Sequence, residues 1–443
     1  MQDVDIIISG GTVLTMDGTE PPIHDGYIAI RGDEIIAVGD RNTMSPLYRG
    51  KRTLEAANHL VMPGLVNCHT HAAMTCFRGI ADDKELMDWL NNYIFPAESR
   101  NVDPELVYWG SLLACAEMIR SGTTTFCDMY LFEEETAQAA HRAGMRCLLG
   151  EVLFDFPSPN IKTPEEGLAY TERLIDKWHD DPLVSIVVEP HSLYTCSPEL
   201  LKAAKALANR YGVPYATHFL ENRGEFDQLK AKLGRRASLY LKDIGCLDER
   251  FFAFHCVYMD AKDIDIFAEH GCKVVHNPES NMKLASGTPL LSVMQERGLT
   301  VGLGTDGCAS NNNLDMLQEM DTAAKLEKVV RFNPTAMAAM TVARMATTDG
   351  ARVLGLENVT GRLKPGMKAD IIMIDLDRPH LTPVYDEYST LVYAANGSDV
   401  TTVIINGRPV MEDRTLLTID EKEVMDRVEN ISRRIKKNMG FDT

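Results

Sequence analysis

The sequence lacks several features that mark particular classes of protein. No uninterrupted apolar run reaches the roughly 18 residues that a membrane-spanning helix needs, so we expect no membrane partner. Basic residues are outnumbered, with 45 Lys and Arg against 64 Asp and Glu and a formal net charge of −19. Because nucleic-acid binders gather basic side chains against phosphates, this balance argues against a nucleic-acid partner and favours a small-molecule ligand.

The cysteines and the first residues show two further absences. None of the cysteines forms a Cys-x-x-Cys pair, so neither a structural zinc knuckle nor a disulfide framework is indicated, and we expect reduced thiols. The acidic start, Met1–Asp5, has neither the basic region nor the apolar region of a secretion signal. We therefore predict a cytoplasmic protein.

What is present is the composition of a folded globular protein. Hydrophobic residues make up 45% and charged residues 25% of the 443-residue chain, close to globular averages. A chain of this length is too long for one ordinary core. We expect one large domain of about 250 to 300 residues and a smaller one.

A repeated strand–helix pattern begins near residue 61 and predicts an α/β fold, a (β/α)8 TIM barrel. Capping residues followed by proline mark helix starts at Asp103, Ser197 and Asn333. No Gly-x-Gly-x-x-Gly motif follows the first strand, which disfavours the alternative of a doubly wound open sheet. The barrel strands are expected at residues 60–68, 123–129, 147–153, 184–190, 213–217, 251–255, 273–276 and 300–305.

Short strands separated by turns are expected before the barrel, and β character returns after it. The later strand-like segments are residues 370–375, 391–394 and 400–407. Neither end is long enough for a sandwich by itself, so we predict that the two chain ends pair in one small β-sandwich domain. The predicted divisions are residues 1–60 and 361–443 for the sandwich, residues 61–360 for the barrel, and a charged terminal helix over 421–438.

Two histidines, His69 and His71, follow the first predicted barrel strand. Side chains alternate between the faces of a strand, so both imidazoles can converge on one ion. His-x-His also occurs by chance, and two polar residues that simply end a strand are the alternative. A metal site therefore requires partners elsewhere in the chain.

Four further predicted strands end in side chains of the ligand type, namely His218, His255, His276 and Asp306. The carboxyl ends of barrel strands meet at one mouth, where these residues would converge. We predict that His69, His71, His218 and Asp306 hold one divalent metal ion, zinc or alternatively Fe²⁺. Such an ion would lower the pKa of a bound water towards about 7, and Asp306 would also accept the proton of that water.

Glu221 and His255 are predicted to act on the reacting molecules. Glu221 lies three residues after His218, and a turn there would swing its carboxylate over the barrel mouth as a proton donor to the substrate. A solvated loop glutamate is the alternative. His255 is expected to hydrogen-bond the activated water. For His276, a role in the site and a purely structural role remain as alternatives.

Longer motifs make nearly the whole chain resemble a known family. They are MPGLVNCHTH at residues 62–71, DWL at 88–90 with PAE at 96–98, GTTT at 122–125, THFLE at 217–221, HNPESNMKLASG at 276–287, GTDG at 304–307, GRLKPGMKAD at 361–370 and VIING at 403–407. With these motifs the chain resembles the amidohydrolase superfamily and, within it, the 5′-methylthioadenosine/S-adenosylhomocysteine deaminases.

The resemblance implies hydrolytic deamination of a 5′-substituted adenosine to its inosine analogue and ammonia. Water adds to C6 of the adenine ring, Glu221 protonates N1, and ammonia leaves after proton delivery that involves Asp306. A mononuclear site is implied as well, because the fourth strand ends at 189–191 without the lysine of binuclear relatives. Residues matching Glu98 and His191 bind the ribose hydroxyls and contact the nucleoside in the family, and the resemblance is compatible with a homo-oligomer.

One departure from the family bears on the 5′ substituent. Glu151 stands where characterised relatives have an arginine that meets the homocysteine end of the larger substrate. Because an acidic residue there would repel a carboxylate, we predict a preference for 5′-methylthioadenosine or another short 5′-substituted adenosine. The alternatives are a guanine, pterin or s-triazine deaminase or chlorohydrolase, for which a ribose-binding Glu98 has no use, and a non-enzymatic homologue, which would have lost ligands.

Overall fold

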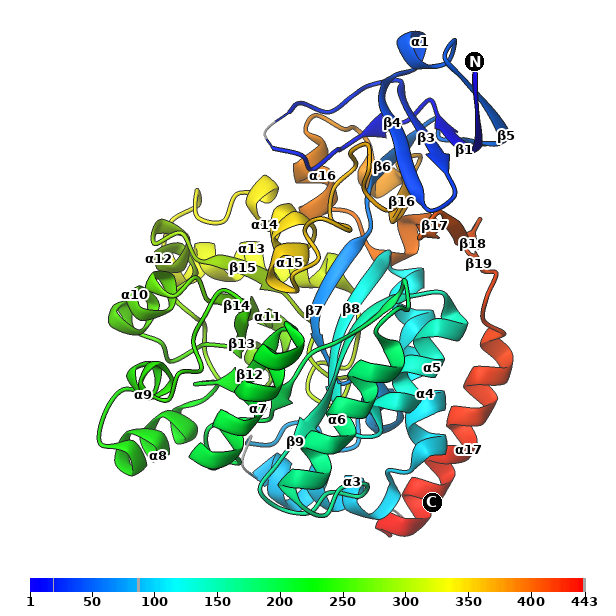
Figure 1. Ribbon diagram of the computed structural model, residues 1–443. Helices are drawn as coiled ribbons and strands as arrows, with labels where there is room; N and C mark the ends of the chain where they lie inside the picture. The colour runs from blue at the N-terminus through cyan, green and yellow to red at the C-terminus, as the bar shows by residue number, and fades with distance from the viewer. Residues whose placement is uncertain (19, 86–87, 441–443) are drawn as a thin grey trace.

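The computed structural model describes residues 1–18, 20–85 and 88–440, and its larger part is a barrel of parallel strands (Figure 1). Five strands form one half of the wall and four form the other. The first half consists of β7 (Leu65–Thr70), β8 (Thr123–Tyr130), β9 (Arg146–Leu153), β10 (Val184–Ile186) and its continuation β11 (Glu189–Pro190). The second half consists of β12 (Tyr215–Phe219), β13 (Phe251–His255), β14 (Lys273–His276) and β15 (Thr300–Leu303).

Backbone contacts at two seams close these halves into a barrel. At one seam Val188 forms a parallel bridge with Tyr215. At the other, the amide of Asp306 donates to the carbonyl of His69 at 2.9 Å. The predicted (β/α)8 barrel is confirmed, and β10 and β11 stand in place of one continuous fourth strand. The first strand was expected over residues 60–68, but residues 59–63 form a separate strand in a terminal sheet, and only β7 belongs to the barrel wall.

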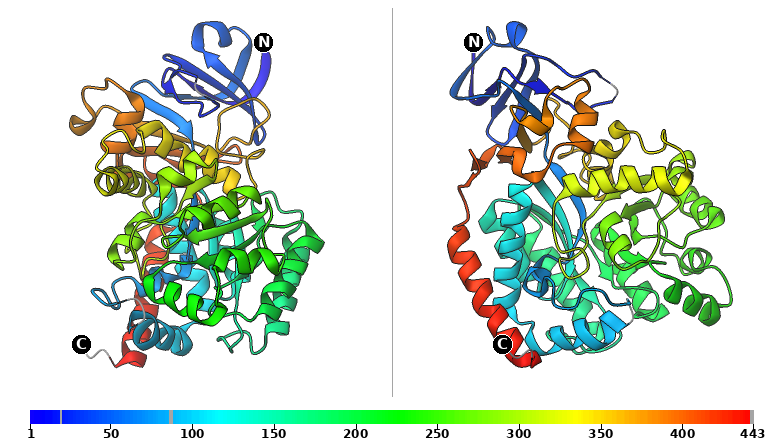
Figure 2. Two further views of the ribbon diagram at one scale, coloured as in Figure 1. Left: turned by 90° about the vertical axis from the view of Figure 1, so that its left-hand side faces the viewer. Right: turned by 180° about the vertical axis from the view of Figure 1, so that it is seen from behind.

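Helices follow the strands and cover the barrel from outside (Figures 1 and 2). Two predicted helix starts are correct, since the side chains of Asp103 and Ser197 accept from the amides of Leu106 and Leu200 at 2.8 and 3.2 Å. The helices of the barrel are η1 (Ala72–Phe77), the π-helix η2 (Trp89–Ile94), α3 (Phe95–Asn101), α4 (Pro104–Arg120), α5 (Glu133–Ala143), α6 (Pro164–Trp178), α7 (Pro198–Tyr211), α8 (Arg223–Leu233), α9 (Ala237–Asp243), α10 (Ala261–Glu269), α11 (Pro278–Lys283), α12 (Leu291–Glu296), α13 (Met316–Arg331), α14 (Ala339–Met345) and α15 (Thr348–Val353).

The two chain ends pair with each other, as predicted. One sheet has the order β4-β3-β1-β5, and a second sheet, β19-β18-β17-β16-β6-β2, mixes strands from both ends. Isoleucines of both sheets, including Ile8, Ile28, Ile371 and Ile404, are buried in one shared cluster. The strands are β1 (Gln2–Ser9), β2 (Thr12–Val13), β3 (Gly26–Arg31), β4 (Glu34–Asp40), β5 (Tyr48–Glu55), β6 (His59–Pro63), β16 (Ile371–Asp375), β17 (Val400–Ile405), β18 (Arg408–Glu412) and β19 (Thr415–Leu416), and the short helices are α1 (Arg41–Met44), η3 (Pro379–Leu381), α16 (Glu387–Tyr393) and η4 (Gly397–Asp399).

Two local predictions are wrong. Residues 391–394 were expected as a strand, but Asp386 accepts from the amide of Ser389 at 2.6 Å and caps the helix α16. Asn333 was expected to cap a helix. Its side chain instead accepts from the amide of Thr335 in a turn, and the next helix begins at Ala339. The division at residue 60 stays a prediction, and β6 spans it.

The terminal helix α17 (Glu421–Met439) lies along the barrel helix α4, away from the terminal sheets (Figure 1). Val424, Val428, Ile431 and Ile435 are buried at spacings of three and four residues, so one face of the helix packs against the barrel. An ion pair between Arg120 and Glu421 fixes its first turn. No helix among the described residues is long and apolar enough to cross a membrane.

Truncation of this buried face should destabilise the protein. Because Ile431 is fully packed, we expect Ile431→Ala to lower the free energy of unfolding by about 2 to 4 kcal/mol through lost burial and the resulting cavity. Met425 lies on the exposed face of the same helix, so Met425→Ala should cost no more than about 0.5 kcal/mol. Urea unfolding measures both values, and equal values for the two variants would show that α17 does not pack as described.

Candidate active site

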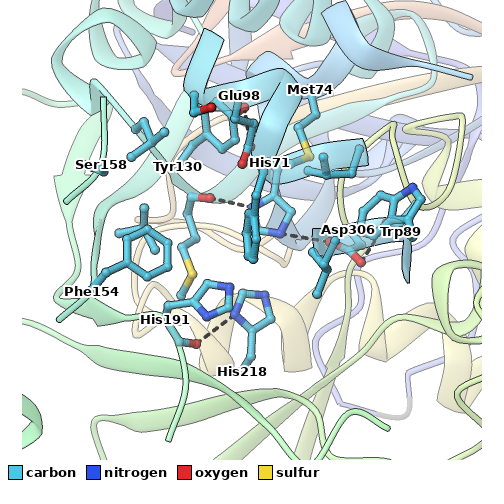
Figure 3. Close-up of a pocket in the computed structure, with 18 of the residues that line it drawn as sticks. His71, Met74, Trp89, Glu98, Tyr130, Phe154, Ser158, His191, His218 and Asp306 are labelled. Carbon is cyan, nitrogen blue, oxygen red and sulfur yellow. Dashed lines mark hydrogen bonds and ion pairs between the residues drawn. The ribbon is translucent and has the colours of Figure 1, made fainter. Parts of the chain in front are cut away.

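A cavity of about 1100 Å³, including its open mouth, lies at the carboxyl ends of the barrel strands. Figure 3 shows Glu98 and Met74 on one side of this pocket and His191 and His218 on the opposite side, with His71 between them. Most of the predicted site residues line it: His71, Glu98, His191, His218, Glu221, His255 and Asp306. His69 lies buried beside this group, with its ring edge against the rings of His71 and His218.

The polar atoms of the four predicted ligands and His255 form two overlapping groups that share His69, one with His71 and Asp306 and the other with His218 and His255. The Nε2 atoms of His69 and His218 are 3.2 Å apart. Oδ1 of Asp306 lies 3.4 Å from Nε2 of His69 and 3.1 Å from Nε2 of His71. Gly304 allows this approach, because a Cβ there would lie 2.7 Å from the backbone nitrogen of His69.

Backbone carbonyls orient two of these imidazoles. Nδ1 of His71 lies 2.5 Å from the carbonyl oxygen of Met129, and Nδ1 of His218 lies 2.9 Å from that of His191. A carbonyl can only accept, so we assign a proton to Nδ1 of each ring. The Nε2 atoms therefore face the centre of the cluster, which is the arrangement that metal-binding histidines adopt.

The cluster attracts positive charge. Burial holds the pKa of His69 at about 3 and the pKa of His218 well below its ordinary value, so both rings are neutral. At His71, burial also lowers the pKa, but the hydrogen bond and charge of Asp306 outweigh it and raise the pKa to about 9, so this ring holds a proton that a bound cation would displace. Imidazole nitrogens around a carboxylate are a donor set that suits zinc or ferrous iron.

Asp306 is held in its ionised form in an unusual backbone conformation. Its φ is +64°, in the left-handed region that non-glycine residues rarely adopt. The hydroxyls of Ser280 and Ser310 donate to Oδ2 at 2.6 and 2.9 Å. Burial raises its pKa, but hydrogen bonds from His69 and His71 outweigh this and lower the pKa well below the usual range.

Glu221 and His255 meet at the edge of this cluster. Leu220, with φ +52°, makes the turn expected after the strand, and Oε2 of Glu221 lies 4.0 Å from Nε2 of His255. Burial raises the pKa of Glu221, which favours a carboxyl group that carries a proton. Nδ1 of His255 bonds Oδ1 of Asn281 at 2.9 Å, so its Nε2 faces the same space, and its ring nitrogens lie close enough to His69 and His218 to share an ion.

Glu98 lies across the cavity, on α3. The hydroxyl of Tyr130 donates to its carboxylate at 2.7 Å, while burial, which this bond partly offsets, raises its pKa to about 7. The preceding π-helix was not predicted, and it places Trp89 and Ile94 in the cavity wall. The sequence signals that could have found this wall are the DWL and PAE motifs, which mark the segment but not its helical type.

Glu151 does not have the predicted role. It is fully buried and outside the cavity lining, because its neighbour Val152 lines the cavity and alternate residues of a strand point to opposite faces. Its carboxylate accepts from the amide of Glu133 at 3.0 Å and from Asn160 at 2.7 Å. The expectation that Glu151 would repel a substrate carboxylate is therefore wrong.

Three further residues near the cavity differ in how far the sequence predicted them. They are His276, Ser280 and Ser310. His276 is buried outside the cavity lining, and its ring nitrogens have no hydrogen-bond partner among the described residues. The two serines that hold Asp306 were not predicted as site residues. Ser280 belongs to a motif that the sequence singled out, whereas Ser310 gave no such signal.

A barrel whose strand ends carry histidines and an aspartate around one cavity defines the class of TIM-barrel enzymes with a site built at the carboxyl-terminal face. Within that class, the chain belongs to the amidohydrolase family, whose model matches residues 60–410. The resemblance drawn from the sequence motifs is thereby confirmed.

Individual relatives extend the similarity to both chain ends. The chain is 64% identical to 5-methylthioadenosine/S-adenosylhomocysteine deaminase 1 of Syntrophus aciditrophicus, over 99% of each chain. It is 45% identical to 5′-deoxyadenosine deaminase of Methanosarcina barkeri, over 95% of this chain and 96% of the relative. A crystal structure of an adenosine deaminase from Xanthomonas campestris with bound zinc superposes with a TM-score of 0.97 and 36% identity, over 98% of this chain and 99% of that one.

Proposed function

We propose that the protein deaminates a 5′-substituted adenosine by hydrolysis, giving the inosine analogue and ammonia. One observation carries the proposal: a single cavity holds the histidine–aspartate cluster, the buried carboxyl of Glu221 beside it, and Glu98 on the far side. Such an arrangement provides for activation of water, protonation of a ring nitrogen and recognition of a ribose. The names of the full-length relatives support the same reaction.

The cluster would hold one divalent ion, zinc or alternatively Fe²⁺, through His69, His71, His218 and Asp306. The donor set and the inward-facing Nε2 atoms support this assignment. When bound, the ion supplies Lewis acidity that makes a water molecule acidic enough to lose a proton near neutral pH.

The protein's own groups then move the protons. Asp306 is ionised and accepts the proton of the attacking water, while the Nε2 lone pair of His255 accepts a hydrogen bond from it. Glu221, whose pKa is raised, donates a proton to N1 as the water oxygen bonds to C6. Asp306 then passes its proton to the amino group and the C6–N bond breaks to release ammonia. The proton that remains on the C6 hydroxyl returns to the Glu221 carboxylate as the C6 carbonyl forms, so one water is consumed and one ammonia leaves.

Glu98 and His191 would hold the nucleoside. The carboxylate of Glu98 accepts from Tyr130 and has further acceptor capacity for ribose hydroxyls. His191 lines the cavity with its ring, and its Nδ1 is engaged by Thr195 at 3.1 Å. A ribose-binding Glu98 has no use in a deaminase or chlorohydrolase for free guanine, pterins or s-triazines, so its position favours a nucleoside substrate.

The cavity favours an uncharged 5′ substituent. Among the described residues that line it there is no lysine or arginine, and much of the wall is apolar, including Trp89, Leu90, Ile94, Phe154 and Phe156. The carboxylate of a homocysteine group would lose hydration here without gaining a cationic partner. The apolar wall, rather than Glu151, therefore supports the preference for 5′-methylthioadenosine or 5′-deoxyadenosine.

Two further proposals concern the cellular compartment of the protein and its partners. The ten cysteines are all buried and unpaired, which supports a reducing compartment such as the cytoplasm. The proposed partner is a small nucleoside. Formation of a homo-oligomer stays a prediction.

Removal of one ligand should abolish metal binding. We expect His218→Ala to lower bound zinc from about one ion per chain to less than about a tenth, because a neutral imidazole is lost from a site with four protein donors. His276→Ala removes another buried histidine outside the cluster and should keep its zinc. Elemental analysis after dialysis measures both, and retention of zinc by His218→Ala would contradict the proposed ligand set.

Glu221→Gln should remove the proton donor while preserving shape. We expect kcat for ammonia release from 5′-methylthioadenosine to fall by about 10² to 10⁴-fold, with a much smaller change in KM. Glu199→Gln, at an exposed glutamate of α7, is the control and should behave like the unaltered protein. A normal kcat for Glu221→Gln would refute the proton-transfer role.

A substrate panel tests the apolar 5′ preference. We expect kcat/KM for 5′-methylthioadenosine and 5′-deoxyadenosine to exceed that for S-adenosylhomocysteine by about tenfold or more, because the charged group is desolvated without a partner. The assay is ammonia release with zinc supplied, and guanine is included as the free-base alternative. Equal values for the three nucleosides would contradict the preference, and turnover of guanine alone would contradict the proposed reaction.

A further inference from the structure

A carboxylate outside the cavity lining binds the turn that carries Glu221. Oε1 of Glu225 accepts from the amide of Leu220 at 3.0 Å, and Oε2 accepts from the amide of Glu221 at 2.7 Å. Glu225 is only 3% exposed, and it is absent from the residues that line the cavity. Both oxygens of one buried side chain are therefore committed to two consecutive amides of the functional turn.

These bonds differ from those of an ordinary helix cap. Glu225 is the third residue of α8, and Asn222 caps the helix by accepting from the amide of Glu225 at 3.0 Å. In a capping box, a glutamate at this position reaches back to the amide of the capping residue. Here it reaches past Asn222 to Leu220 and Glu221, so the bonds stabilise the turn that precedes the helix.

The backbone of that turn has an unfavourable conformation that hydrogen bonds stabilise. Leu220 has a φ of +52°, a conformation that is unfavourable for a residue with a Cβ. The amide of Tyr258 donates to the carbonyl of Leu220 at 3.0 Å, and the carboxylate of Glu225 supplies acceptors on the amide side. Together they hold the backbone from both sides, just before Glu221 extends towards His255.

We infer that Glu225 is a positioning residue for the proton donor. Its carboxylate accepts hydrogen bonds from the amides of Leu220 and Glu221, and these bonds fix the Glu221 carboxyl within hydrogen-bonding distance of the substrate ring. The inference rests on the proposed function, in which Glu221 protonates N1. Misplacement of a reacting group by about 1 Å can cost about 10²-fold in rate, which is why a residue without substrate contact can matter.

The variant Glu225→Gln tests this with little change in shape. A carboxamide has one acceptor oxygen, so one of the two amides would face an NH₂ group and lose its bond. We expect kcat for 5′-methylthioadenosine to fall by about 10 to 100-fold with KM changed less than about threefold.

The matched control is Asp263→Asn. Asp263 occupies the same third position of the helix α10 and is equally buried. It accepts from its own capping residue Asp260 at 3.2 Å in a regular capping box. It is outside the cavity lining. Its replacement should lower the melting temperature without lowering kcat, whereas a kcat loss equal to that of Glu225→Gln would reduce the role of Glu225 to general stability.

A double-mutant cycle separates positioning from stability. If Glu225 acts through Glu221, then adding Glu225→Gln to Glu221→Gln should change kcat by less than about twofold. An equal loss in both backgrounds would overturn the inference, and so would a normal kcat for Glu225→Gln alone. A normal kcat for Glu221→Gln, by contrast, would overturn the proposed function.

Amide hydrogen exchange provides a readout that does not depend on residual activity. In the zinc-loaded protein, Glu225→Gln should accelerate exchange in a peptide that contains Leu220 and Glu221, and Asp263→Asn should leave that peptide unchanged. Unchanged protection of the peptide in Glu225→Gln would overturn the inference, even if the double variant were too slow to assay.

Discussion

The hydrogen bond from the amide of Asp306 to the carbonyl of His69 links the fold of the barrel to the geometry of the candidate site. It closes the barrel between the first and last strands, and it also brings the Asp306 carboxylate against the rings of His69 and His71. Barrel closure and assembly of the polar cluster are thus one event. Gly304 permits it, because any side chain there would collide with the backbone of His69.

Three residues around the candidate site share a left-handed backbone conformation. Leu220, His255 and Asp306 have φ between +52° and +67°, each at or shortly after the end of a barrel strand. Such conformations persist only when neighbouring bonds hold them, and they are common at functional sites. Here the bonds come from the next strand end, as when the amide of Cys256 donates to the carbonyl of Phe219 at 3.0 Å. These bonds hold the strand ends beside one another, which suits catalysis by positioned groups.

Strand positions were predictable because each barrel strand is a short apolar run that ends in a polar residue, and the topology places those ends together. The direction of a side chain was not predictable from alignment, so Glu151 was assigned to the cavity although it faces away beside Val152. Residues 391–394 have β-type composition, and only the upstream cap at Asp386 made them helical. Two other features depend on tertiary contacts that no local pattern encodes. They are the packing of α17 on α4 and the hydrogen bonds of Glu225 to the amides that precede Asn222.

We propose that the inward-facing donors of the cluster hold one divalent cation. Anomalous diffraction from crystals of the zinc-loaded protein, recorded on both sides of the zinc absorption edge, tests this assignment. We expect one strong peak per chain, about 2.0 to 2.2 Å from Nε2 of His69, His71 and His218 and from a carboxylate oxygen of Asp306. A peak elsewhere, or none at this cluster in zinc-replete crystals, would contradict it.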